Sequence, residues 1–191
     1  MKLVSIHIGG LYASRESVVV ETVLGSCVAA CLYDPVNRVG GMNHFLLPRK
    51  CQEDSMLGRY GEYAMALLIE RIIGLGGRLS NLQAKVFGAA SVLKMDETRH
   101  SVPRANERFV REFLTAQGIP LLGERMGGDN PIKVRMSTDT GKALVKALPR
   151  THLDRVLAKE GELYTVALAR RWAWFEERQE TGVAACQKSR F

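Results

Sequence analysis

The chain has 191 residues, a length that favours one compact domain over two. It is 46% hydrophobic and 25% charged and has no low-complexity tract, so it is expected to fold rather than remain disordered. The net charge of +7 suits an acidic partner, but basic residues are scattered among acidic ones and no nucleic-acid-binding motif is present, which argues against DNA or RNA. The N-terminus lacks a signal-peptide pattern and no apolar run reaches membrane-spanning length, so we expect a cytoplasmic protein without membrane insertion.

The first part of the chain is predicted to be rich in strands. Alternating or β-branched apolar runs predict strands at 2–8, 17–24, 28–33 and 39–48. The turn-forming residues Asp34-Pro35-Val36-Asn37 lie between the last two runs and predict a β-hairpin. Gly9-Gly10 and Gly25 end the first two strands.

The second part mixes helices and strands. Helical spacing of apolar residues predicts helices at 62–73 and 107–117, the latter with Asn106 as its N-cap. Further strands are predicted at 82–87, 119–122, 133–137 and 142–148. Strands outnumber helices, and the elements predict an α+β layered fold.

The pattern changes past Pro149. A long polar and apolar helix is predicted from about 154 to 180, followed by a frayed end. We therefore divide the chain into a domain at 1–149 and a C-terminal helical extension at 150–191.

The spacing of the four cysteines predicts neither a disulfide framework nor a metal site. Cys27 and Cys31 lack the second CxxC or histidine pair that zinc needs, and no metal or other cofactor is predicted. Cys31 lies inside an apolar run and is interpreted as a core residue, and Cys51 and Cys186 as incidental. Cys27 remains as the candidate nucleophile.

The predicted hairpin brings Cys27 to a base. If Asp34 and Asn37 close the turn, Cys27 lies directly opposite His44, with their Cβ atoms about 5 Å apart. Alternatively, Cys27 begins a helix whose N-terminal dipole favours a thiolate. Gly25 permits a sharp turn, after which amides around Ser26 and Cys27 could hold an oxyanion.

Two questions stay open at this point. Free cysteine is among the most buried residue types and a lone histidine is usually structural, so the residues alone also allow a non-catalytic pair. A third group normally orients the base, and Thr22 and Glu21 are both candidates. As neighbours on a strand they face opposite ways, so at most one can serve.

The order of short motifs along residues 2–148 resembles the chemoreceptor glutamine deamidase family, CheD. The motifs are LGSCVAACLYDP at 24–35, GGMNHFLLP at 40–48, RYG at 59–61, AKVFG at 84–88, the Asn106 helix start, GG at 127–128, KVR at 133–135 and TG at 140–141. The resemblance implies a three-layer αββ fold related to toxin-type cysteine deamidases and a Cys-His-Thr active site without a cofactor. Cys27 and His44 match the nucleophile and the base. In some relatives the threonine lies six residues before the cysteine, where this chain has Glu21, and we choose Thr22, which lies five before.

The resemblance also implies a function. It implies a protein-glutamine glutaminase, a hydrolase that converts glutamines on the cytoplasmic helices of methyl-accepting chemoreceptors into glutamates in bacterial chemotaxis. Some members of the family also hydrolyse glutamate methyl esters, and members can bind the phosphatase CheC. We expect a monomer. The alternatives are a non-catalytic chemotaxis adaptor that docks CheC or receptors, and a different thiol hydrolase such as a peptidase or a transglutaminase-like enzyme.

Overall fold

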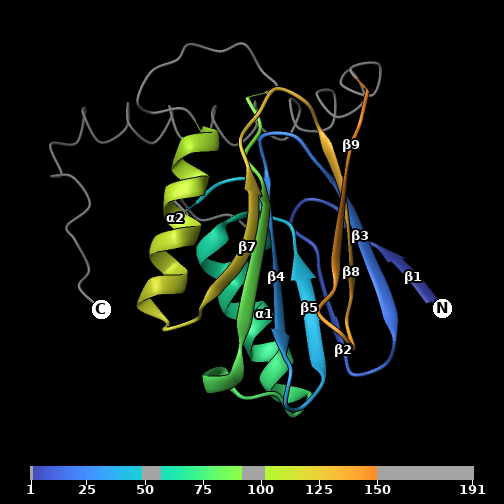
Figure 1. The fold of residues 1–191 in the computed structure, drawn as a ribbon. Helices are drawn as coiled ribbons and strands as arrows, with labels where there is room; N and C mark the ends of the chain where they lie inside the picture. The colour runs from blue at the N-terminus through green and yellow to red at the C-terminus, as the bar shows by residue number, and fades with distance from the viewer. Residues whose placement is uncertain (1, 49–56, 92–101, 150–191) are drawn as a thin grey trace, which may run out of the picture.

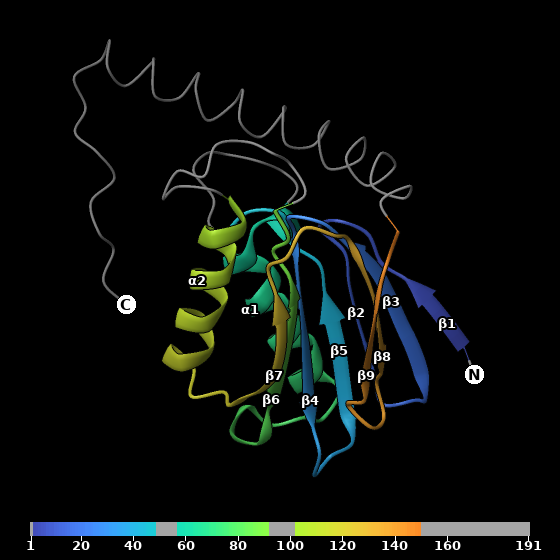
Figure 2. The same cartoon turned by 45° about the horizontal axis from the view of Figure 1, so that its top comes forward.

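The fold is a three-layer arrangement of two helices and two sheets, seen in a computed structural model that describes residues 2–48, 57–91 and 102–149. The helices cover one face of a five-stranded sheet, and a four-stranded sheet covers the other face (Figures 1 and 2). The helices are α1 (Gly61–Gly74) and α2 (Val102–Ala116), with short 3₁₀ turns at Leu57–Arg59 and Leu79–Asn81. The predicted α+β class and its αββ layering match this structure.

The five-stranded sheet has the order β2-β5-β4-β6-β7 and the four-stranded sheet the order β1-β3-β8-β9. The strands are β1 (Lys2–Ser5), β2 (Leu11–Ser14), β3 (Val18–Leu24), β4 (Val28–Asp34), β5 (Val39–Asn43), β6 (Gln83–Gly88), β7 (Leu121–Met126), β8 (Ile132–Ser137) and β9 (Ala143–Ala147). Strand β2 was not predicted, because four residues are too short to show a period. The strand predicted at 119–122 begins later and extends to Met126.

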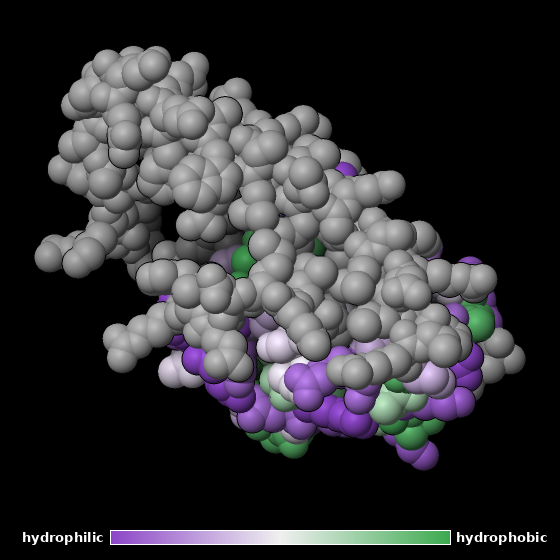
Figure 3. Space-filling view, turned by 90° about the horizontal axis from the view of Figure 1, so that it is seen from above, coloured by the Kyte–Doolittle hydropathy of each residue, from purple (hydrophilic) through white to green (hydrophobic). Residues whose placement is uncertain are grey.

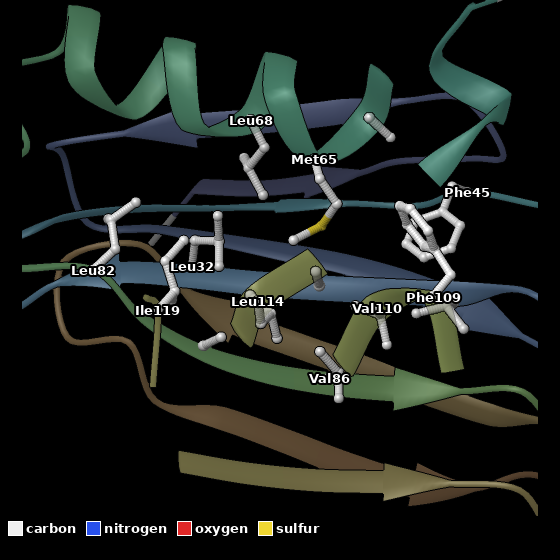
Figure 4. Packing of buried hydrophobic residues seen from close by; sticks show 14 of the residues in the cluster. Leu32, Phe45, Met65, Leu68, Leu82, Val86, Phe109, Val110, Leu114 and Ile119 are labelled. Carbon is white, nitrogen blue, oxygen red and sulfur yellow. The ribbon is translucent and has the colours of Figure 1, made fainter. Parts of the chain in front are cut away.

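Strand β4 is buried on both faces, which explains its continuous apolar sequence. Val28, Ala30 and Leu32 face the helices, where they join a core with residues of α1 and α2. Figure 4 shows this core, to which α1 contributes Met65 and Leu68 and α2 contributes Leu114 and Val110. The alternate residues Ala29 and Cys31 face the other way, into a second core between the two sheets. The two cores hold the three layers together.

The register of the β4–β5 hairpin differs from the prediction. Asp34 pairs with Val39, and Tyr33 pairs with Gly40 rather than with Arg38. The Asp34 carboxylate accepts hydrogen bonds from the backbone N–H groups of Val36 and Asn37, and Arg38 takes a left-handed φ of 52°, so four residues form the turn instead of two. The predicted direct pairing of Cys27 with His44 is therefore wrong.

Two predictions of helix ends are also wrong. Cys27 does not begin a helix, because it lies in a bend immediately before strand β4. Helix α2 begins at Val102, so Asn106 is a buried residue within the helix and not its N-cap. Its neighbours on the buried face are Phe109 and Val110, three and four residues later, which is the spacing of one helical face.

Other features concern the surface and the remaining parts of the chain. In the view from above, the described surface that can be seen is mostly hydrophilic, with scattered hydrophobic residues (Figure 3). Neither described helix combines the length and apolar character needed to cross a bilayer. The predicted C-terminal extension at 150–191 lies outside the described residues.

Candidate active site

Cys27 directly precedes β4, the central strand of the five-stranded sheet, and its side chain has no exposed surface. Its thiol is not part of a disulfide. Backbone hydrogen bonds hold this segment, from the Ala89 N–H to the Cys27 carbonyl and from the Ala90 N–H to the Gly25 carbonyl, both at 2.8 Å. Gly88 makes this close approach possible, because it has a φ of 117° and a Cβ there would lie 2.1 Å from the Cys27 carbonyl oxygen. The end of β6 therefore fixes the backbone that carries the thiol.

His44 directly follows β5, at the same end of the sheet, and is 3% exposed. The loop between β1 and β2 holds its backbone on both sides. The Gly9 N–H donates to the His44 carbonyl at 2.8 Å, and the His44 N–H donates to the Gly10 carbonyl at 3.0 Å. The imidazole is therefore carried by a backbone with little freedom.

Thr22 comes from β3 in the other sheet and contacts this histidine. Its Oγ1 lies 2.8 Å from Nδ1 of His44 and 2.9 Å from the carbonyl oxygen of Ile6. A carbonyl only accepts, so the single hydroxyl proton of Thr22 is donated to Ile6. The Thr22 oxygen must then accept a hydrogen bond from Nδ1–H of His44. From this chain of hydrogen bonds we assign the His44 tautomer in which Nδ1 carries the proton and Nε2 does not.

The electrostatics of the site agree with this tautomer. Burial, together with the charge of His7, lowers the pKa of His44 to about 3, so the imidazole is neutral at physiological pH. Within the described part of the chain, the buried Nε2 atom has no hydrogen-bond partner. A neutral imidazole with an available Nε2 lone pair can accept a proton from a thiol or from water.

Cys27 and His44 face the same layer although they are not directly opposed. Val28 and Phe45 pair through two backbone hydrogen bonds of 3.0 and 2.9 Å. Continuing this register places Cys27 opposite Leu46, with His44 as its diagonal neighbour on the same face. Because the register shift is two residues, it preserves the face that each side chain occupies.

Glu21, the other candidate for the third group, lies on the opposite face of β3. Its carboxylate accepts hydrogen bonds from Arg135 at 2.9 Å and from Lys133 at 3.1 Å. Burial raises the pKa of Glu21, but Arg135, Lys133 and a hydrogen bond from Ser5 together outweigh burial and hold the pKa below its usual value. Thr22, and not Glu21, contacts His44.

The remaining sequence-predicted residues also have defined places. The carbonyl of Ser26 accepts a hydrogen bond from Nδ2 of Asn106 at 3.4 Å. Cys31 is buried, as predicted for a core residue, and burial raises the pKa of its thiol to about 12. No cluster of three or more metal-ligating side chains occurs within residues 2–48, 57–91 and 102–149. The prediction of Asn106 as an N-cap gave this residue no role at the site. Its helical spacing with Phe109 and Val110 is the signal that could have placed it on the buried face.

The fold and these contacts define a class of protein: an α+β protein that brings a buried thiol and a threonine-bound, neutral histidine into the layer between two sheets. Comparison with known proteins then gives the family. Residues 46–147 match the family described as CheD chemotactic sensory transduction. The chain belongs to the CheD family.

Relatives from several bacteria cover most of the chain. A protein of Stenotrophomonas maltophilia (strain K279a) and one of Xanthomonas euvesicatoria pv. vesicatoria (strain 85-10) are each 46% identical over 145 residues, which is 76% of this chain and 73% of each relative. A protein of Burkholderia mallei (strain SAVP1) is 45% identical over 156 residues, 80% of this chain and 66% of the relative. All three bear the name probable chemoreceptor glutamine deamidase CheD.

Proposed function

We propose that this protein is a protein-glutamine glutaminase that converts glutamines of methyl-accepting chemoreceptors into glutamates. The relatives' names state this activity for them. The observation in this chain that best supports the chemistry is the hydrogen-bond chain from the Ile6 carbonyl through Thr22 to His44, because it leaves Nε2 of the imidazole unprotonated. An unprotonated Nε2 is what a general base for a thiol requires.

In the proposed mechanism, His44 takes the Cys27 proton and the thiolate attacks the Cδ atom of the substrate glutamine. The tetrahedral intermediate collapses as the Cδ–N bond breaks, and His44 returns the proton so that ammonia leaves. The resulting thioester is attacked by a water molecule from which His44 removes a proton. The C–S bond then breaks and the thiol is restored, so that glutamine and water give glutamate and ammonia. No metal or organic cofactor takes part in this proposal.

Thr22 has the role of holding the His44 ring and its tautomer through both steps. The hydrogen bond from Nδ1 also stabilises the imidazolium that forms transiently. The backbone amides of the Gly25-Ser26-Cys27 bend are the proposed donors to the oxyanion. Preorganised donors of this kind contribute about 3–4 kcal/mol to transition-state stabilisation.

The proposed partners follow from the substrate and from the charge. The net charge of +7 complements an acidic receptor helix, and charge complementarity raises the rate of association. The target glutamines would lie on the cytoplasmic helices of the receptors, so the proposed location is the cytoplasm. A monomeric state, binding of the phosphatase CheC and a second activity on glutamate methyl esters belong to the same proposal.

The test is to incubate the full chain with a receptor cytoplasmic fragment and to measure ammonia release together with the mass of each receptor peptide. We expect ammonia release and conversion of glutamine to glutamate without cleavage of the receptor chain. Cys27→Ala should abolish both, whereas Cys31→Ala, which changes a thiol on the same face of β4, should retain them.

Each outcome separates the candidate functions. Undiminished deamidation by Cys27→Ala would refute the thiol mechanism. Cleaved receptor peptides would indicate a peptidase instead. Receptor binding without any ammonia release from the wild-type chain would indicate an adaptor.

A further inference from the structure

Asn106 connects the two segments that carry Cys27 and His44. It lies in α2 and is fully buried. Its Nδ2 donates to the carbonyl of Leu46 at 2.9 Å and to the carbonyl of Ser26 at 3.4 Å. Ser26 directly precedes Cys27, and Leu46 follows His44 by two residues, so one amide group holds both segments.

The helix that carries Asn106 is firmly held against the same region. Phe109, one turn further along α2, packs edge-on against Phe45, with ring centroids 5.9 Å apart and an interplanar angle of 85° (Figure 4). Gly61 of α1 leaves room for this ring, because a Cβ at that position would lie 2.4 Å from Phe109. Asn106 therefore acts from a rigid element, which is what accurate positioning of a site requires.

Stability alone does not account for an asparagine at this place. Its Oδ1 atom is buried and has no hydrogen-bond partner among the described residues. A buried acceptor left unpaired costs about 1–3 kcal/mol. The Asn106 side chain keeps an unpaired Oδ1 at this cost while its Nδ2 group holds the Ser26 and Leu46 carbonyls. This points to a functional requirement for the positions of those two carbonyls.

The orientation of the Ser26 carbonyl also sets the peptide that follows. In a trans peptide the C=O and the next N–H point in opposite directions. Because the Ser26 oxygen is turned toward Asn106, the Cys27 N–H is turned away from it. Asn106 thus acts together with the end of β6 on the position of the Cys27 backbone, and it favours one direction of the Cys27 amide.

We propose that Asn106 is a positioning residue that sets the placement of Cys27 relative to His44. The proposal rests on the deamidase function above. Loss of the Nδ2 donor should release the Ser26 and Leu46 carbonyls and shift the thiol from the imidazole. A displacement of about 1 Å can lower a catalytic rate about 100-fold, so kcat should fall by about that factor while KM stays close to the wild-type value.

The test compares full-length Asn106→Leu and Asn106→Asp with the wild type and with Thr138→Val. Asn106→Leu removes the Nδ2 donor at nearly constant size, and Asn106→Asp replaces it with a carboxyl group that has at most one proton to donate and so cannot hold both carbonyls. Thr138 is a matched control, since it is also fully buried and its Oγ1 forms hydrogen bonds with the backbone of Glu16 and Val18. These residues lie at the start of β3, away from the end that carries Thr22. Rates are measured with the receptor fragment well below the melting temperature of each variant, so that all chains are folded.

We expect Thr138→Val to lose stability with kcat unchanged, and both Asn106 variants to lose kcat with KM retained. A wild-type kcat in the folded Asn106 variants would overturn the proposal. So would a loss of kcat that equals the fraction of unfolded chains in each variant. If Asn106→Leu and Asn106→Asp do not fold, Asn106→Ser decides by the same criteria, because its short hydroxyl cannot bridge both carbonyls. An inactive wild-type chain would instead refute the deamidase function, so the two failures are distinguishable.

Discussion

Replacing Thr22 with valine tests whether the Thr22–His44 contact is functional. Valine keeps the shape of threonine but removes the hydroxyl, and with it the hydrogen bonds to His44 at 2.8 Å and to Ile6 at 2.9 Å. The substitution leaves two buried groups without a partner, Nδ1–H of His44 and the Ile6 carbonyl, at about 1–3 kcal/mol each, so the free energy of unfolding should fall by about 2–6 kcal/mol. Nδ1 of His44 also loses its acceptor, and the tautomer with an unprotonated Nε2 is no longer favoured.

The expected effect on catalysis follows from the role of the base. A positioned general base contributes about 10²–10⁴-fold, so we expect Thr22→Val to lower kcat by about 100-fold, the lower end of this range. A factor of 100 corresponds to about 2.7 kcal/mol, which lies within the range of about 1–3 kcal/mol for one buried group left without a partner. The assay is steady-state ammonia release from a receptor fragment, at a temperature where every variant is folded.

Two control variants separate Thr22 from its neighbour. Thr22→Ser keeps the hydroxyl and should retain most of the activity. Glu21→Gln weakens contacts with Lys133 and Arg135 on the outer face of β3 and should leave kcat close to wild type. Wild-type kcat in Thr22→Val, or a large loss in Glu21→Gln, would refute the assignment of Thr22 as the orienting group.

Three further predictions concern the surroundings of the site. First, the free energy of unfolding, measured in denaturant titrations, should decrease by about 1.4 kcal/mol per pH unit as the pH falls from 6.5 toward the His44 pKa of about 3. The reason is that in this pH range the unfolded state binds a proton at His44 that the folded state excludes. His44→Gln should lack this contribution. Second, Gly88→Ala should lower both the melting temperature and kcat, since its Cβ would lie 2.1 Å from the Cys27 carbonyl, whereas Gly123→Ala, with its nearest contact at 3.8 Å, should change neither. Third, Asp34→Asn should lower the free energy of unfolding by about 1.5–3 kcal/mol, which is the range for hydrogen bonds to a charged group. Its kcat should stay unchanged, because the turn lies at the end of the β4–β5 hairpin that is far from Cys27 and His44. A loss of kcat in the folded variant would contradict this separation of the turn from the site.

The elements of the fold were largely predictable because they depend on local patterns. The β-branched run of β3 and the helical spacing of α1 are visible in the sequence, and both elements form close to the predicted residues. The wrong hairpin register has an equally local cause. The Asp34 side chain and the left-handed Arg38 extend the turn by two residues, and a residue other than glycine gives no sequence signal for that conformation.

Within the site, the sequence by itself determined the candidates and the face that each one occupies. Alternation along β3 requires Thr22 and Glu21 to face opposite ways, and strand periodicity puts Cys27 and His44 on one side of their sheet, even in the corrected register. Only the tertiary structure decided which of the two β3 faces meets His44, because that contact joins different sheets and depends on how they pack. The same holds for Asn106, whose bonds to Ser26 and Leu46 span 80 and 60 residues of chain. Periodicity assigns a side chain to a face, but only the packing of distant elements determines what that face contacts.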